Sequence, residues 1–308
     1  MIVKTRGSFE SDIAQLNELL SFRLTDKQRF LIEREIRFLR SGDKGEKDSV
    51  YYIDFYLGKS KNWAIIHDLR LSFFGQTAQI DHVLMNRFLE VYVLETKNYA
   101  YSVKINPDGE FLVSHNGKYY SIESPIEQNQ RHIFLLKKVI DHYQIMPTRL
   151  GIPIPPSFNT LILVSPTSRV IRPAKNQLDT SKVVKSDQAI DTIMKEVDKN
   201  VGILGITKMI STATLTETAT KLSQLHQPIS FNYKAKFGIP ETAKQQEQNP
   251  PTPSQHKTSE QNGKSYYCIK CRKPISQKVA QYCWDRKNIF GGRAYCFDCQ
   301  KEVSKSTS

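Results

Sequence analysis

Apolar residues recur every three or four positions through much of residues 10–40, with charged side chains between them. This period predicts helices, because residues three or four apart share one face of a helix. The glycine-containing stretch 41–45 predicts a break in the helical region. The apolar run that follows, 50–57, predicts a further helix that begins near Gly45 and Glu46.

The pattern changes to short apolar runs after this helix. Runs at 63–71, 79–85 and 89–95 have the length and composition of strands. Asn86 and Arg87 lie between the last two runs. This short connection predicts that the two strands pair as a tight hairpin.

Further strands and helices are predicted up to residue 238. The run 160–164 is almost wholly apolar, which is typical of a strand buried in a sheet. Ser186 has the side chain of a helix N-cap. The other predicted elements are short strands around the turns at 106–109 and 115–117, a helix opened by Pro125, a helix after Ser186, and a helix over 215–225.

The composition changes at residue 239. Residues 239–263 contain four prolines, five glutamines and no aromatic residue. Such a segment buries too little apolar surface to fold, so 239–265 is predicted to be a flexible linker. We therefore divide the chain into a helical segment (1–40), a main domain (41–238), the linker, and a small cysteine-bearing module (266–308).

The chain is strongly basic. Its 44 Lys and Arg against 31 Asp and Glu give a formal net charge of +13, and the sequence pI is 9.4. Nucleic acid is therefore the first candidate partner, although surplus lysines can also simply solvate a surface. No apolar run approaches the roughly 18 residues that span a membrane, and the first residues lack the apolar core of a secretory signal. We expect a cytoplasmic protein without membrane contact, and the sequence leaves its oligomeric state open.

The candidate chemistry lies in the predicted hairpin. Asp81 interrupts an apolar strand, and Glu95 and Lys97 lie two apart at the end of the next strand, on one face. Pairing brings Asp81 within reach of that face, and the preceding helix offers Glu46. Carboxylates beside a lysine suit a Mg²⁺ nuclease site, because Mg²⁺ prefers oxygen ligands and lowers the pKa of bound water. The alternative is a surface ion pair between Glu95 and Lys97.

Four blocks of sequence occur in an order that resembles a known family. They are Gly45-Glu46, then QIDHVL at 79–84, VLETKN at 93–98 and PIEQNQRH at 125–132. Together they resemble the nuclease-related domain (NERD) family of the PD-(D/E)xK restriction-endonuclease-like superfamily, over about residues 40–165. The resemblance implies an α/β fold with an α-β-β-β-α-β core around a mixed central sheet. Residues 166–238 contain no motif that we can interpret, and they either complete the nuclease domain or form a C-terminal helical extension of it.

The resemblance also implies roles for single residues. Glu46, Asp81 and Glu95 correspond to the family's characteristic acidic positions and would hold Mg²⁺ or Mn²⁺, with the backbone carbonyl of Thr96 as a further ligand. Lys97 would position the attacking water. Gln128 matches a glutamine of the following helix that supports the site. His82 and His132 are expected to be packed histidines rather than ligands or bases.

All five cysteines lie between residues 268 and 299. Cys268 and Cys271 form one CxxC knuckle, and Cys296 and Cys299 form a second. Two such knuckles supply four thiolates for a structural Zn²⁺ ion, which would stabilise a module too small to fold well alone. Cys283 is the odd cysteine. It can be buried, replace one ligand or bind a second site weakly, and we favour a buried structural cysteine.

The module carries cations and aromatic rings. Residues 266–308 hold nine Lys and Arg and three acidic residues, a surplus of six positive charges. Bases can stack on the rings while the cations meet phosphates. The alternative is that the rings only form the small core. The module resembles the four-cysteine zinc fingers found beside DNA-processing domains, including those at topoisomerase C-termini.

The sequence therefore predicts a Mg²⁺-dependent nuclease that hydrolyses phosphodiester bonds, with DNA favoured, tethered to a zinc finger that aids nucleic-acid binding. The main alternative is a non-catalytic DNA-binding or adaptor protein on a nuclease-like fold, because a fold does not settle function. A third possibility is a zinc-dependent protein-interaction module.

Overall fold

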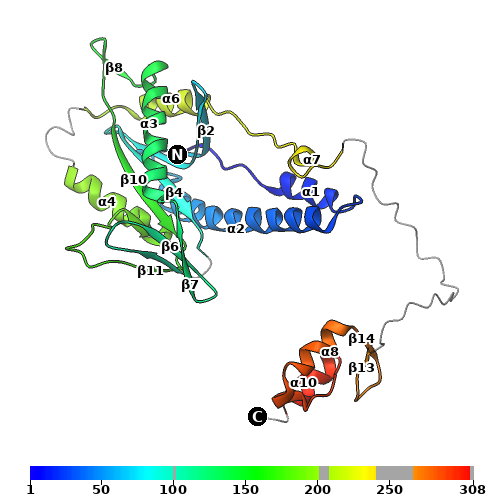
Figure 1. The fold of residues 1–308 in the computed structure, drawn as a ribbon. Coiled ribbons are helices and arrows are strands. Elements are labelled where there is room, and N and C mark those ends of the chain that lie inside the picture. Colours follow the sequence, from blue (N-terminus) through cyan, green and yellow to red (C-terminus); the bar gives the residue numbers. More distant parts are fainter. Residues whose placement is uncertain (100–101, 201–207, 241–265, 306–308) are drawn as a thin grey trace. The chain divides into compact units, whose positions relative to one another are not determined.

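The computed structural model describes residues 1–99, 102–200, 208–240 and 266–305 (Figure 1). The chain divides into two compact units, one within Met1–Gln246 and the other within Glu247–Ser308. Most of the predicted linker, 241–265, lies outside the described residues. In the described parts of the chain, no helix combines the length and the apolar character needed to cross a membrane.

Two helices open the first unit, α1 (Glu10–Leu19) and α2 (Asp26–Leu57). A capping box fixes the start of α2, where the Thr25 side chain accepts from the Gln28 amide and the Gln28 side chain accepts from the Thr25 amide. The helix then runs without interruption through 41–45. The predicted break at this stretch is therefore wrong.

Tertiary packing on two sides explains why α2 continues. Its first half packs with α1 and with the short helix α7 (Tyr233–Lys236), where Ile239 is also buried. Its second half packs through Ile53 and Leu57 on the large sheet. These contacts outweigh the cost of a glycine in a helix interior, which is about 1 kcal/mol.

The large sheet has six strands in the order β1-β2-β3-β4-β10-β12. The pairs β2-β3 and β3-β4 are antiparallel, and the pairs β1-β2, β4-β10 and β10-β12 are parallel, so the sheet is mixed. The hairpin predicted around Asn86 and Arg87 is confirmed, since Met85 pairs with Val91 and His82 with Leu94. The strands are β1 (Ile2–Lys4), β2 (Trp63–Phe73), β3 (Gln76–Asn86), β4 (Glu90–Lys97), β10 (Ser157–Val164) and β12 (Val183–Lys185).

A second sheet has the order β11-β5-β6-β7. It confirms the short strands predicted around the two turns, and Val103 and Phe111 pack it against Ile162 of β10. Its strands are β5 (Ser102–Ile105), β6 (Phe111–His115), β7 (Lys118–Ile122) and β11 (Arg169–Ile171). A small hairpin joins β8 (Thr148–Arg149) to β9 (Ile152–Pro153).

Helices cover both faces of the large sheet. One core cluster joins α3 (Pro125–His142) and α6 (Thr212–Ser223) to one face. Another joins the end of α2 and α4 (Ala189–Asn200) to the opposite face. The elements α2, β2, β3, β4, α3 and β10 follow one another in that order. Strands β5, β6 and β7 of the second sheet are inserted between β4 and α3, and its strand β11 follows β10. The prediction of an α/β fold with a mixed sheet and N-terminal helices is confirmed.

Ser186 differs from its predicted role. It opens a short 3₁₀ turn, Ser186–Gln188, that leads into α4, and its side chain does not cap the helix. Instead the buried hydroxyl donates to the carbonyl oxygen of Val164 at 3.4 Å. This contact ties the start of the turn to β10, so a tertiary contact has replaced the local one.

The second unit is small and largely helical. The strands β13 (Tyr266–Tyr267) and β14 (Pro274–Ile275) pair as an antiparallel hairpin around the first CxxC knuckle. Two helices, α8 (Gln277–Trp284) and α9 (Lys287–Phe290), lie between the knuckles in the sequence. The second knuckle begins at Cys296 and leads into α10 (Phe297–Lys305).

Two glycines of α2 give a matched test of this packing. A Cβ added at Gly45 would lie 2.6 Å from Cβ of Asn98, whereas one added at Gly42 would meet nothing within 4 Å. We predict that Gly45→Ala lowers the free energy of unfolding by about 1–3 kcal/mol, because overpacking forces α2 away from the end of β4. Gly42→Ala should raise it by roughly 0.5–1 kcal/mol. Urea unfolding measures both, and stabilisation by both variants would contradict the close contact at Gly45.

Candidate active site and zinc centre

The ends of β3 and β4 place the predicted acidic residues side by side. The antiparallel register sets Asp81 beside the end of β4, where the backbone amide of Thr96 donates to Oδ2 of Asp81 at 2.7 Å. Glu95 is buried and Asp81 is half-buried. The hairpin thus brings Asp81 to Glu95 and Thr96, as its sequence position predicts.

Lys97 and Gln128 complete a triangle with Glu95. Nζ of Lys97 donates to Oε1 of Glu95 at 2.7 Å and to Oε1 of Gln128 at 2.9 Å. Nε2 of Gln128 donates to the same Glu95 oxygen at 2.9 Å. The first turn of α3 therefore fixes both the acid and the lysine. The second oxygen of Glu95, Oε2, is buried and has no hydrogen-bond partner.

Glu46 reaches the site from α2 but is held by a different cation. Nε of Arg6 donates to Oε2 of Glu46 at 2.6 Å, and Nη1 of Arg6 donates to Oδ1 of Asp43 at 2.8 Å. Arg6 lies just after β1, and it is forty positions before Glu46 in the sequence. No motif in the sequence marks this arginine as part of the site.

Burial and mutual repulsion disfavour the charged forms of the acids. Burial raises the pKa of Asp81 well above its usual range, and the charges of Glu95 and Glu46 raise it further. Burial also raises the pKa of Glu95, against the lowering effect of Lys97. Burial raises the pKa of Glu46, against Arg6. Such a cluster gains stability from a proton or from an added cation.

His132 is a neighbour of Glu95 that the sequence reasoning assigned to packing alone. Its Nδ1 lies 3.5 Å from Oε2 of Glu95, and the ring is buried. Burial lowers the pKa of His132 to about 4, so the ring is neutral at neutral pH. The signal that marks it is its spacing, since His132 follows Gln128 by four residues on the same face of α3.

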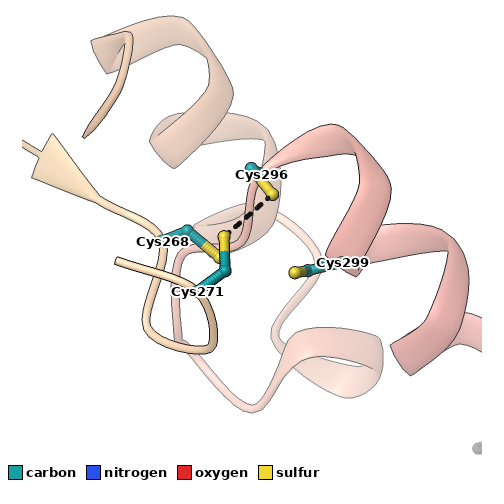
Figure 2. A group of neighbouring side chains, drawn as sticks. All are labelled: Cys268, Cys271, Cys296 and Cys299. Atoms are coloured by element: carbon teal, nitrogen blue, oxygen red, sulfur yellow. Dashed lines mark hydrogen bonds between the residues drawn. The ribbon is translucent and has the colours of Figure 1, made fainter. Parts of the chain in front are cut away.

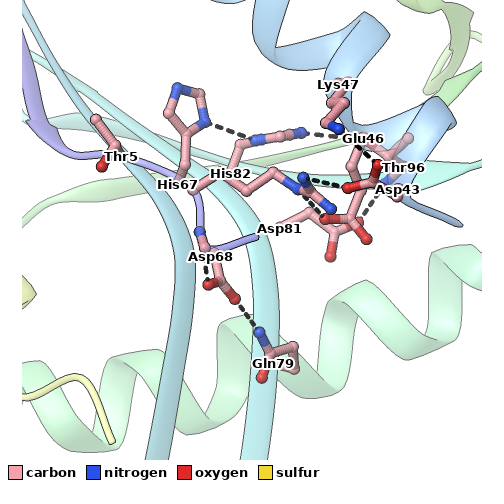
Figure 3. A network of polar contacts seen from close by, with 12 residues as sticks. Thr5, Asp43, Glu46, Lys47, His67, Asp68, Gln79, Asp81, His82 and Thr96 are labelled. Atoms are coloured by element: carbon pink, nitrogen blue, oxygen red, sulfur yellow. Dashed lines mark hydrogen bonds and ion pairs between the residues drawn. The ribbon is translucent and has the colours of Figure 1, made fainter. Parts of the chain in front are cut away.

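A chain of hydrogen bonds runs on the other face of the sheet from Asp54 to Thr96, and Figure 3 shows the part that contains His67, His82 and Thr96. Nε2 of His67 lies 3.0 Å from Oδ1 of Asp54, and the Nδ1 atoms of His67 and His82 are 2.8 Å apart. Nε2 of His82 lies 3.1 Å from the hydroxyl of Thr96. This chain ends on the residue whose amide holds Asp81.

The chemistry of these groups fixes the direction of the chain. Burial lowers the pKa of His67 and lowers that of His82 well below its usual range, so both rings are neutral. A carboxylate only accepts, so His67 donates to Asp54 through Nε2. His67 then accepts from His82, and His82 accepts from the Thr96 hydroxyl. Each ring has one defined tautomer, which orients the end of β4.

The fold and these contacts define an α/β protein whose mixed sheet carries two carboxylates, a lysine and a glutamine at the end of β3 and β4. Residues 41–157 match the model of the NERD family, the nuclease-related domain. This part of the chain is therefore a nuclease-related domain. Neither the curated proteins nor the solved structures gave a match to the chain.

The second candidate site is the cysteine cluster. One ligand atom each from Cys268, Cys271, Cys296 and Cys299 lies within 4.8 Å of the others, and the two knuckles face each other (Figure 2). In the described parts of the chain, these four form the one group of three or more His, Cys, Asp or Glu residues placed to hold a metal ion. Glu46, Asp81 and Glu95 are neighbours, but their carboxylate oxygens are not grouped as closely as the four cysteine sulfur atoms.

The four thiols have the electrostatics of a cation site. Burial opposes ionisation of Cys268, but the backbone amides of Cys271, Cys296 and Lys270 lower its pKa to about 6. Burial and the neighbouring thiols raise the pKa of Cys299 to about 12. Four thiolates therefore need a cation between them, and four sulfur ligands are consistent with a structural zinc site.

Cys283 stands apart from this group. It is fully buried, and its Sγ accepts from the backbone amide of Tyr295 at 3.4 Å and from Nε2 of Gln300 at 3.2 Å. These contacts link α8 to the start of the second knuckle. The structure therefore places Cys283 in the core of the module rather than among the candidate ligands.

We predict that metal content separates these cysteines. Cys299→Ser should lose bound zinc and unfold the second unit, because one of four ligands is removed from a module that the metal stabilises. Cys283→Ser should keep one zinc per chain. Metal analysis of the purified proteins measures this, and loss of zinc from Cys283→Ser alone would contradict the assignment.

We also predict that acid weakens the fold partly through His67. Burial lowers its pKa, so the unfolded chain binds a proton near its ordinary pKa of about 6.5 that the folded chain does not bind. The contribution of neutral His67 to stability is therefore complete above that pH and is lost as the pH falls, by up to about 1.4 kcal/mol per pH unit.

Urea unfolding of the parent and of His67→Gln tests this at about pH 7.5 and about pH 5.5, on either side of the ordinary histidine pKa. The parent should lose more stability than the variant on going to the lower pH. Equal losses would contradict a neutral ring buried beside Asp54.

Proposed function

We propose that the chain is a Mg²⁺-dependent nuclease that hydrolyses phosphodiester bonds, with DNA as the favoured substrate, on a restriction-endonuclease-like core. One observation carries the proposal. Within the nuclease-related domain, Glu95 and Lys97 share a hydrogen-bonded triangle with Gln128 beside the half-buried Asp81. Surface ion pairs rarely involve a buried carboxylate with a free oxygen and a second acid as neighbour.

The residues at the end of β4 suit a hard cation. Asp81, Glu95 and the backbone carbonyl of Thr96 would hold Mg²⁺ or Mn²⁺, with Glu46 close enough to raise the pKa values of both acids. All the donors are oxygens, which is the set that Mg²⁺ prefers. The unpartnered Oε2 of Glu95 and the repulsion among the acids are the features that a cation would relieve. When bound, Mg²⁺ supplies an acidified water and stabilises charge on the phosphate.

The protein side chains divide the remaining tasks. Lys97 is half-buried and fixed by two acceptors, so its ammonium group can orient the attacking water and contact a phosphate oxygen. Gln128 holds one oxygen of Glu95 and leaves the other free. Arg6 holds Glu46 through a short ion pair and keeps that acid near the site despite the repulsion.

The zinc module would supply additional affinity for the nucleic acid. Its surplus of six positive charges favours a polyanion. A flexible tether raises the local concentration of substrate at the catalytic domain. Zinc would act here by stabilising the fold, with no part in the chemistry.

Cleavage of supercoiled plasmid tests the proposal. We predict metal-dependent nicking by the parent, and a loss of roughly 100-fold or more in Lys97→Ala and Asp81→Asn, because each removes a group that acts on the reacting phosphate or on its cation. Plasmid binding should survive in both variants. Lys195→Ala is the matched control, because Lys195 pairs with Asp191 on the exposed face of α4.

Three outcomes would contradict this proposal. Salt-sensitive plasmid binding without cutting by the parent, repeated with RNA and branched DNA, would favour the non-catalytic DNA-binding protein. Equal nicking by the parent and Lys97→Ala would place the activity elsewhere. Weak binding with little salt dependence would favour a protein-interaction module.

A further inference from the structure

The zinc module has an open groove beside its first knuckle. The groove has a volume of about 870 Å³. Aromatic and cationic side chains dominate its lining, together with one exposed isoleucine. These are Tyr266, Tyr267, Ile269, Arg272, Trp284 and Arg293. All the residues that line the groove belong to the second unit.

Two aromatic rings of the groove pack against each other, and a third is exposed. Tyr266 and Trp284 are partly exposed and meet edge to face with their ring centres 5.4 Å apart. Tyr267 is 57% exposed and Ile269 is 58% exposed, although both adjoin the buried Cys268. Large apolar side chains this exposed in so small a module offer contact area to a ligand.

Two cations border these rings. In the part of the chain that the structure describes, neither Arg272 nor Arg293 forms a side-chain hydrogen bond or an ion pair. Two other cations of the module are engaged, since Lys270 pairs with Glu302 and Cζ of Arg286 lies 3.9 Å from the ring centre of Tyr282. The two guanidinium groups of the groove are therefore available to an anionic ligand.

The backbone of Arg272 has an unusual conformation for an arginine. Its φ is +59°, a left-handed conformation that favours glycine, and its amide closes the knuckle by donating to the carbonyl of Cys268 at 2.8 Å. An arginine is less favourable than a glycine in this conformation, because its Cβ lies close to the backbone. The chain therefore has a long cationic side chain at a position where the backbone conformation favours glycine.

We propose that this groove binds single-stranded nucleic acid. Bases would stack on Tyr267 and Trp284 while Arg272 and Arg293 contact the phosphates. A single strand fits better than a duplex, because duplex bases already stack on each other and present no free face to a ring. The inference rests on the proposed role of the module in nucleic-acid binding and specifies its ligand.

The test uses the full-length, zinc-loaded chain with Lys97→Ala, in buffer without added Mg²⁺, so that bound strands are not cut. Fluorescence anisotropy measures affinity for a labelled thymidine oligonucleotide of about 12 nucleotides and for a duplex of equal length. We expect tighter binding of the single strand at equal salt. Tyr267→Ala should weaken that binding by about 10-fold, whereas Tyr267→Phe should restore it, because a phenyl ring still stacks.

Matched variants separate stacking from charge and from loss of folding. Arg293→Gln should weaken binding of the oligonucleotide and reduce its salt dependence by about one phosphate contact. Phe297→Ala and Lys278→Gln remove an exposed ring and an exposed cation outside the groove, and both should bind as the parent does. Zinc content must be equal in all variants, so that a lost fold is recognised.

Three results would overturn the inference. The first is unchanged oligonucleotide binding by both groove variants, and the second is equal weakening of single-strand and duplex binding by Tyr267→Ala. The third is displacement of the bound oligonucleotide by an acidic peptide, because the groove would then select for negative charge and not for bases. The nuclease proposal can fail while the groove proposal stands. A parent protein that cuts neither plasmid nor RNA, but whose oligonucleotide binding depends on Tyr267, would contradict the nuclease activity and support the groove as a binding site.

Discussion

Repulsion among carboxylates is the constraint around which the candidate site is built. Burial raises the pKa values of Asp81, Glu95 and Glu46, and the charge of Glu46 raises those of Asp81 and Glu95 further. The fold tolerates them because Lys97 and Arg6 each hold one acid and a backbone amide holds the third. Gly45 lets α2 approach β4 at Asn98, and so brings Glu46 near the other two. The proposed Mg²⁺ or Mn²⁺ would neutralise negative charge that these protein groups leave unpaired.

The part of this arrangement that is local in sequence could be predicted from the sequence. Asp81, Glu95 and Lys97 belong to one hairpin, so strand alternation and a short turn suffice to place them on one face. Gln128 was placed by resemblance to a family, because only a tertiary fold brings α3 to β4. The cysteines were found from spacing alone, since four thiolates in two knuckles have few other uses.

The parts of the site that the sequence did not predict depend on contacts between segments that are distant in the chain. Arg6 reaches Glu46 across forty residues, and Asp54, His67 and His82 come from three elements, so no local pattern marks them. The same reason explains the errors at 41–45 and at Ser186. In both places a glycine or serine has its usual local signal, but packing against β4 or β10 decides the backbone.

Direct measurement of cation binding tests the central claim without relying on turnover. Titration of the zinc-loaded chain with Mn²⁺, followed by electron paramagnetic resonance of the free ion, counts the sites and their affinity. We predict one Mn²⁺ site that Mg²⁺ displaces and that Asp81→Asn weakens by at least about 10-fold, because the metal and a repelled carboxylate stabilise each other. Absence of a site in the parent, or equal binding by Asp81→Asn, would contradict a metal centre at the end of β3 and β4.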